Sequence, residues 1–110
     1  MLKKENRIRL KNDFDRVFKH GLSFYNKKIG VKFLENNSDF SRLGIIVSNK
    51  VSKKAVERNR LKRIIRDFFY SKITEIQPKK DFVVIILPGI DKNKDELEKL
   101  LQLIFKKIKN

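Results

Sequence analysis

The chain has 110 residues, a net charge of +15 and 40% hydrophobic residues, which predicts one domain with a modest core and excludes an acidic or low-complexity disordered polymer. Because it contains no Cys, a disulfide framework, a Cys-ligated zinc site and a thiol nucleophile are excluded. A charge this positive favours a nucleic acid or an anionic membrane surface as the partner.

The sequence predicts that the chain begins with a basic arm, residues 1–11, which is followed by a short helix. Asn12 is expected to cap this helix, which runs from Asp13 to about His20 and stops at Gly21. Three apolar residues share one face of the helix by i, i+3, i+4 spacing: Phe14, Val17 and Phe18.

Strands are predicted by alternating or continuous apolar runs. Residues 28–35 form one expected strand, Asn36–Asp39 a turn, and Leu43–Ser48 a second strand that pairs antiparallel with the first as a hairpin. Asp81–Leu87 is a continuous, largely β-branched run, which is typical of a central strand covered on both faces.

Two longer helices are predicted, from about Lys54 to Ser71 and from roughly Asp95 to Lys107. The first has the apolar stripe Leu61, Ile64, Ile65, Phe68 and Phe69, and the second has Leu97, Leu100, Leu101, Ile104, Phe105 and Ile108. The chain is therefore expected to be α+β, a two-layer α/β sandwich forming a single domain over residues 1–110. Its helices pack on a small mixed sheet of about four strands, in the order α-β-β-β-α-β-α.

The first long helix is unusually basic. Between Lys50 and Arg66 the chain carries eight Lys or Arg residues and one acid. A second stripe, away from the apolar one, consists of Ala55, Asn59, Lys62 and Arg66, flanked by Arg63. A fixed array of cations fits the regularly spaced phosphates of a nucleic acid. The alternative is a solvated helix face, but such a face normally alternates Glu and Lys at i,i+4.

The aromatic pair of the short helix permits two interpretations. Phe14 and Phe18 either pack in the core or form a platform on which unpaired bases stack, with Arg16 and Lys19 beside them. His20 has no acid and nucleophile partners, and the carboxylates are scattered or placed at helix caps. We therefore expect no catalytic residue and no metal ligand in the polypeptide.

These segments resemble the bacterial ribonuclease P protein subunit family. Residues 55–66, AVERNRLKRIIR, are similar to the Arg-Asn-Arg helix signature of that family. Residues 9–21 are similar to its N-terminal helix, and Arg42–Ser48 is similar to the strand before the signature. The resemblance implies a left-handed crossover and a function as the protein component of an endoribonuclease. In that enzyme a catalytic RNA, with Mg²⁺ held mainly by RNA, removes the 5′ leader of precursor tRNA.

The resemblance also implies which residues contact which RNA. Contacts to the catalytic RNA are expected from Lys50, Lys53, Lys54, Arg58, Asn59, Arg60, Lys62, Arg63 and Arg66. Contacts to the single-stranded leader are expected from Arg9, Phe14, Phe18, Lys32 and Phe33. Lys32 stands where family members commonly carry an aromatic residue, so a third ring is either missing or supplied by Phe24 or Tyr25.

Two other classes of protein compete with this interpretation. One is a non-catalytic RNA-binding module, such as a ribosomal protein or RNA chaperone. The other is a protein of anionic membrane surfaces, which the lack of Trp or Leu opposite the apolar stripe of the basic helix disfavours. No apolar stretch reads as a signal or a membrane span, so we expect a cytoplasmic protein with no membrane association and no obligate protein partner.

Overall fold

A computed structural model describes residues 2–109. Its elements are η1 (Lys4–Asn6), α1 (Lys11–His20), β1 (Leu22–Asn26), β2 (Ile29–Glu35), β3 (Arg42–Val47), α2 (Ala55–Tyr70), η2 (Ile73–Glu75), β4 (Lys80–Ile86) and α3 (Lys94–Ile108). The predicted α+β class and the order α-β-β-β-α-β-α are confirmed, and the α2 and α3 boundaries lie within one residue of those expected.

The four strands form one mixed sheet in the order β1-β2-β4-β3. β1 and β2 form an antiparallel hairpin, β2 also pairs antiparallel with β4, and β3 pairs parallel with β4. The predicted hairpin between β2 and β3 is wrong, because β4 lies between them: Val84 is in register with Val31 on one side and Ile45 on the other. The local turn signal after β2 indicates a reversal of the chain, but it carries no information about which later strand enters the gap.

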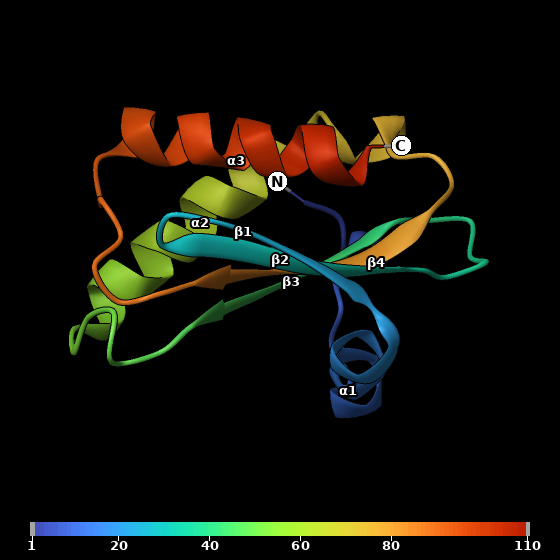
Figure 1. Ribbon diagram of the computed structural model, residues 1–110, viewed down its shortest axis with the longest axis horizontal. Coiled ribbons are helices and arrows are strands. Elements are labelled where there is room, and N and C mark those ends of the chain that lie inside the picture. Colours follow the sequence, from blue (N-terminus) through green and yellow to red (C-terminus); the bar gives the residue numbers. More distant parts are fainter. Residues whose placement is uncertain (1, 110) are drawn as a thin grey trace.

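The parallel pairing of β3 with β4 makes β3-α2-β4 a crossover unit, and its left-handed sense stays a prediction from the resemblance. Two helices, α2 and α3, cover one face of the sheet, and α1 lies against the other (Figure 1). Most of both predicted apolar stripes is buried in the main core, and Leu100 packs against that core while partly exposed. Phe69 lies near the centre, with its ring edge-on to those of Phe68 and Phe82 at 5.1 and 5.0 Å. As expected for a central strand, β4 is buried on both faces.

The second, smaller core lies between α1 and the sheet. Val17 of α1 and Val83 of β4 are fully buried there, together with Ile8 of the N-terminal arm. Phe14 packs against this cluster but stays partly exposed. Since α1 has ten residues, it covers only part of this face of the sheet.

In the N-terminal region the arm packs on the sheet, and the expected start of the first helix is wrong. In the arm Leu2 is buried, and the amide of Ile8 donates to the carbonyl of Leu43 on the outer edge of β3 at 2.9 Å. Asn12 does not cap α1. The helix begins at Lys11, one residue before Asn12, because the Leu10 carbonyl already accepts from the first-turn amides.

Candidate nucleic-acid interface

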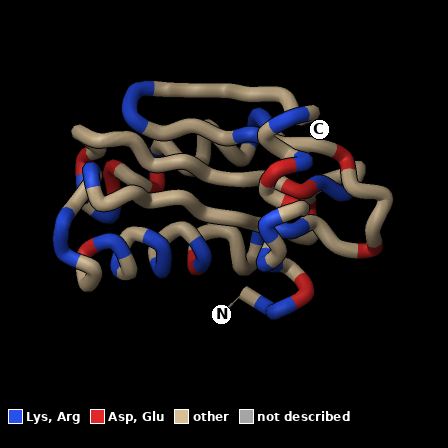
Figure 2. The backbone as a smooth tube through the Cα atoms, turned by 90° about the horizontal axis from the view of Figure 1, so that it is seen from below, with Lys and Arg blue, Asp and Glu red and all other residues tan. Residues whose placement is uncertain are grey.

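The buried stripe of α2 determines which of its cations face solvent. Five of the nine residues expected to contact catalytic RNA are exposed: Lys50, Lys53, Lys54, Asn59 and Arg63. The other four are half-buried: Arg58, Arg60, Lys62 and Arg66. In Figure 2 the Lys and Arg positions of α2 and of the loop before it follow one long edge of the molecule, beside the edge strand β3. The structure thus brings this predicted set together on α2 and on the loop that leads into it.

The two arginines on either side of Asn59 also brace the neighbouring loops. Arg58 donates from Nη1 to the carbonyl of Ser52 at 2.8 Å, and Arg60 donates from Nη1 to the carbonyl of Lys92 at 3.0 Å. Each guanidinium has five N–H donors, so these single bonds leave others for phosphate oxygens. Asn59 stays exposed between them, with its amide available to a ribose or a base edge.

The single acid of this basic run is neutralised from outside the run. Glu57 forms an ion pair with Lys92 of the β4–α3 loop at 3.1 Å. Hydrogen bonding from Ser52, supported by Lys92, lowers the pKa of the Glu57 carboxyl below its ordinary value. Because its charge is matched by Lys92, Glu57 scarcely weakens the positive field of α2.

Aromatic rings lie against the other face of the sheet where two glycines leave room for them. A Cβ added to Gly44 of β3 would stand 2.6 Å from Cε1 of Phe14, so that ring occupies the space above the glycine. The ring of Tyr25 lies over Gly30 of β2 in the same way. These two rings therefore rest on the α1-facing side of the sheet, and neither is fully buried.

Phe18 and Lys32 complete this aromatic surface. Phe18 is 38% exposed, and the ammonium of Lys32 lies 5.8 Å from the centre of its ring. Lys32 also donates to the hydroxyl of Ser23 at 2.9 Å. We call the set Phe14, Phe18, Tyr25 and Lys32 the aromatic surface.

Two of the aromatic residues considered from the sequence lie elsewhere. Phe33 packs against the main core, because side chains alternate along a strand and Lys32 takes the face toward α1. Phe24 also packs against the main core, with the ammonium of Lys107 5.0 Å from its ring centre. Of the two rings left open as a third contact, the structure therefore places Tyr25, and not Phe24, on the face of the sheet that carries α1.

A hollow of about 250 Å³ connects the aromatic surface to the basic helix. Phe14 lines it from α1, Arg66 from α2, and Arg9 from the arm that runs between them. Arg9 is thereby close to both surfaces, which the sequence could not indicate because these three residues come from separate elements.

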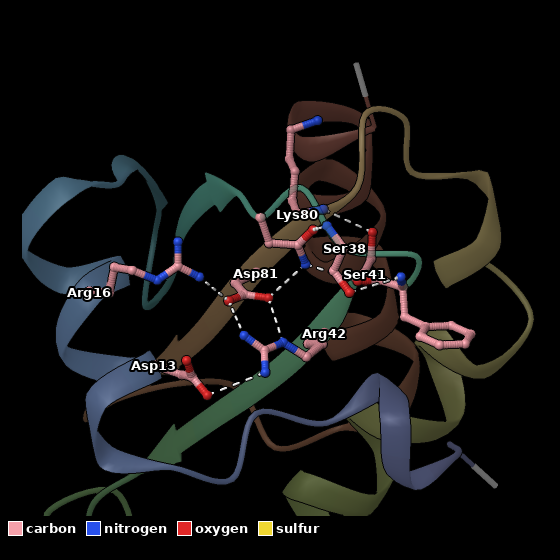
Figure 3. Close-up of polar contacts among 9 residues, drawn as sticks. Asp13, Arg16, Ser38, Ser41, Arg42, Lys80 and Asp81 are labelled. Carbon is pink, nitrogen blue, oxygen red and sulfur yellow. Dashed lines mark hydrogen bonds and ion pairs between the residues drawn. The ribbon is translucent and has the colours of Figure 1, made fainter.

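A buried carboxylate that sequence reasoning missed holds α1 in place (Figure 3). Asp81 at the start of β4 is fully buried and accepts from Arg16 Nη2 at 2.6 Å. Arg42 of β3 donates to both of its oxygens at 2.8 and 2.6 Å, and Asn36 donates at 2.8 Å. Arg42 also reaches Asp13 of α1 at 3.2 Å. The only signal in the sequence is an acid at the start of an otherwise apolar strand.

The hydrogen bonds to Asp81, together with its negative charge, raise the pKa of the Arg42 guanidinium above its ordinary value. The side chains that donate to this carboxylate are all guanidinium or amide groups with good geometry, so burial of the charge is compensated.

Within residues 2–109 no three or more His, Cys, Asp or Glu side chains are grouped so that they could hold a metal ion. In the same part of the chain, no helix has the length and apolar character that crossing a membrane requires. His20 is exposed at the end of α1.

A basic helix face and an aromatic surface on a small α+β fold are features typical of an RNA-binding protein. Within that class the chain belongs to the Ribonuclease P family, whose family model matches residues 2–109. The comparisons do not favour the alternative of a ribosomal protein or RNA chaperone.

Individual relatives agree in sequence and in structure. The chain is 38% identical over 108 residues to the ribonuclease P protein component of Bacillus pumilus, a match that covers 96% of this chain and 90% of that protein. The RNase P protein of Staphylococcus aureus, solved at 2.0 Å, has a TM-score of 0.85 at 34% identity, covering 96% of this chain and 98% of the other. That of Thermotoga maritima has a TM-score of 0.74 at 38% identity, covering 91% and 96%.

Proposed function

We propose that this chain is the protein component of a ribonucleoprotein endonuclease in which the RNA carries the catalysis. The reaction is hydrolysis of the phosphodiester bond that joins the 5′ leader to precursor tRNA. The observation that carries this proposal is the fixed cation array of α2, whose opposite face is locked into the main core. Such an array binds a folded RNA through its phosphates and stays in register with it, which a flexible basic tail cannot do.

The role of the α2 array is to hold the catalytic RNA. Lys62, Arg63 and Arg66 would contact phosphates, while Asn59 would contact a ribose or base edge. The bond from Arg58 to Ser52 would keep the exposed residues of the loop before α2 near the same RNA, while the bond from Arg60 to Lys92 braces the β4–α3 loop.

Mg²⁺ belongs to the RNA in this proposal. The described residues do not fit a magnesium site, since they offer no group of carboxylates for it. The protein's contribution near the reaction is to lower the repulsion between RNA strands and to position them.

The aromatic surface would receive the single-stranded leader. Bases of an unpaired strand stack on Phe14, Phe18 and Tyr25, and Lys32 lies near a phosphate between them. Arg9 and Arg66 line one hollow with Phe14. They would contact the leader where it lies nearest to the catalytic RNA bound on α2. We leave Phe33 out of this surface because it packs against the main core.

The test uses the complex reconstituted with its catalytic RNA. It measures cleavage of precursor tRNA, and it compares the binding of leader-bearing precursor tRNA with the binding of mature tRNA. We expect Phe18→Ala to weaken binding of the leader-bearing precursor by roughly 5- to 100-fold, because the ring on which one base stacks is removed. Binding of mature tRNA should be unchanged. Leu22→Ala, which removes a residue 69% exposed on β1, is the matched control and should behave as the parent.

An equal loss of affinity for leader-bearing precursor tRNA and for mature tRNA would show that the aromatic surface does not bind the leader. A parent protein that gives no gain in cleavage at low Mg²⁺ would overturn the proposed function itself. The cytoplasm, where its RNA partners would be found, is part of the same proposal.

A further inference from the structure

A second aromatic hollow lies at the C-terminal end of α2, away from the aromatic surface. Phe40, in the loop between β2 and β3, and Tyr70, the last residue of α2, are 46% and 51% exposed. Both line one hollow of about 510 Å³. Leu2 and Ile73, each 2% exposed, line it as well and give it apolar walls.

The fold makes little use of either ring. Phe68 and Phe69, which precede Tyr70 on α2, are buried and packed edge-on against each other. By contrast, no hydrogen bond engages the Tyr70 hydroxyl within residues 2–109. The turn that carries Phe40 is held through its backbone, whose carbonyl accepts from Asn36 Nδ2 at 2.9 Å. Two large exposed rings beside one hollow are therefore available to a ligand.

The position of the hollow indicates what that ligand is. Tyr70 follows Lys62 and Arg66 at i+8 and i+4, so it continues the stripe of α2 that faces the catalytic RNA. Leu2 lines both this hollow and the one that holds Arg66 and Arg9. The hollow is thus the continuation of a phosphate-binding edge.

The charge of the hollow indicates how the ligand is held. One cation, Lys3, and one acid, Glu5, line it. Since these nearly cancel, the affinity must come from the rings and the apolar walls. A planar, weakly charged group attached to a polyanion meets both requirements: a nucleobase turned out of its helix.

We propose that Phe40 and Tyr70 hold one unpaired nucleobase of the catalytic RNA, with Lys3 beside its phosphate. This proposal rests on the proposed function and extends it by one specific site. Stacking accepts any base, because every base has a π face, so the site selects for an unpaired nucleotide at this position and not for a sequence. The volume is within the range of pockets that enclose a ligand of nucleotide size.

The test uses full-length protein and intact catalytic RNA. Tyr70→Ala and Phe40→Ala should each weaken binding by roughly 5- to 100-fold, and Tyr70→Phe should bind as the parent does. Because these variants remove stacking and no phosphate neutralisation, the slope of log affinity against log salt should not change. Leu103→Ala, which removes an exposed apolar residue from α3, is the matched control and should have no effect.

Chemical probing of the RNA supplies the direct measurement. The parent protein should protect an unpaired base that is reactive in the free RNA. Phe40→Ala and Tyr70→Ala should leave that base reactive, and the Leu103→Ala control should protect it. Thermal melting checks that each variant is folded. If Tyr70→Ala is not folded, Phe40→Ala decides the question, since the side chains of Asn36 and Ser38 bond the backbone of Phe40 and not its ring.

Three outcomes would overturn the base site. The first is unchanged affinity in both ring variants. The second is a loss confined to leader-bearing precursor tRNA, which would make the leader the occupant. The third is a parent protein that forms a dimer and ring variants that are monomers, which would make a second copy of the chain the occupant. Arg63→Ala distinguishes the two proposals. If this variant binds the catalytic RNA as tightly as the parent does, the proposed function fails. If Arg63→Ala loses affinity for the RNA and Tyr70→Ala does not, the base site alone is overturned.

Discussion

The ring of Phe14 on α1 lies in the space that a side chain on Gly44 of β3 would fill, with 2.6 Å between its Cε1 and the position of an added Cβ. This relationship joins a helix to a strand that is separated from it in the chain by the whole of β1 and β2. It also lets the ring rest on the sheet while one side stays exposed. A small residue in β3 therefore determines how an aromatic residue of α1 is presented.

Gly44→Ala should displace the ring of Phe14. Overpacking of this kind typically costs about 1–3 kcal/mol of the free energy of unfolding, which urea denaturation would measure. The displaced ring should also reduce the preference for leader-bearing precursor tRNA. In the background of Phe14→Ala the same substitution should cost less, because the ring is no longer there to clash; equal costs in both backgrounds would contradict the contact.

Replacing Arg63 or Arg66 singly by Ala should weaken binding to the catalytic RNA and make that binding less dependent on salt. For each phosphate that is no longer neutralised, the slope of log affinity against log salt should fall by about 0.7–0.9. Lys106→Ala, which removes an exposed cation from α3, is the control with the same change in net charge. If all three substitutions lowered the slope equally, the binding would depend on total charge and not on the α2 array.

Asp81→Asn should destabilise the protein by about 2–4 kcal/mol, because it leaves two guanidinium groups without their buried anion. Arg16 and Arg42 keep 39% and 26% side-chain exposure, so water compensates part of the loss. Since Arg16 links α1 to the sheet, selection for the leader should fall even where the variant is folded. Asp15→Asn, in the exposed pair with Lys11, should change stability by under about 1 kcal/mol when both are followed by urea unfolding.

Lys80→Met should stabilise the protein at neutral pH. Lys80 is 4% exposed, and among residues 2–109 its ammonium donates only to the carbonyl of Pro78, at 3.2 Å. Burial lowers its pKa below 10.5, although Glu35 opposes that shift. The buried charge is a cost that Met removes, on the order of 1 kcal/mol.

The pH dependence of this effect has a definite sign. As pH rises, the folded parent releases the Lys80 proton before the unfolded chain does, so its stability increases toward pH 10.5. The advantage of Lys80→Met should therefore shrink as pH rises. Urea unfolding between pH 7 and 10 measures it, with Lys79→Met as the control; an advantage that grew with pH would contradict the assignment.

Sequence patterns predicted most of the secondary structure because the apolar spacing of each long element is local. The stripes of α2 and α3 and the continuous run of β4 each identify an element and its buried side. The same spacing identified the cation face of α2. Strand pairing was predicted wrongly for β2 and β3, because the insertion of β4 between them depends on contacts between distant segments.

The sequence by itself determined that this protein has an α+β fold with a basic helix, since helical periodicity alone separates the buried side of α2 from its charged side. Only the tertiary structure decided which aromatic rings lie on the face of the sheet that carries α1. Strand alternation and the glycines at 30 and 44 place Tyr25 and Phe14 there and turn Phe33 toward the main core. It also decided that Asp81 is the anion that holds α1, because Arg16, Arg42 and Asn36 meet it only after the sheet has formed.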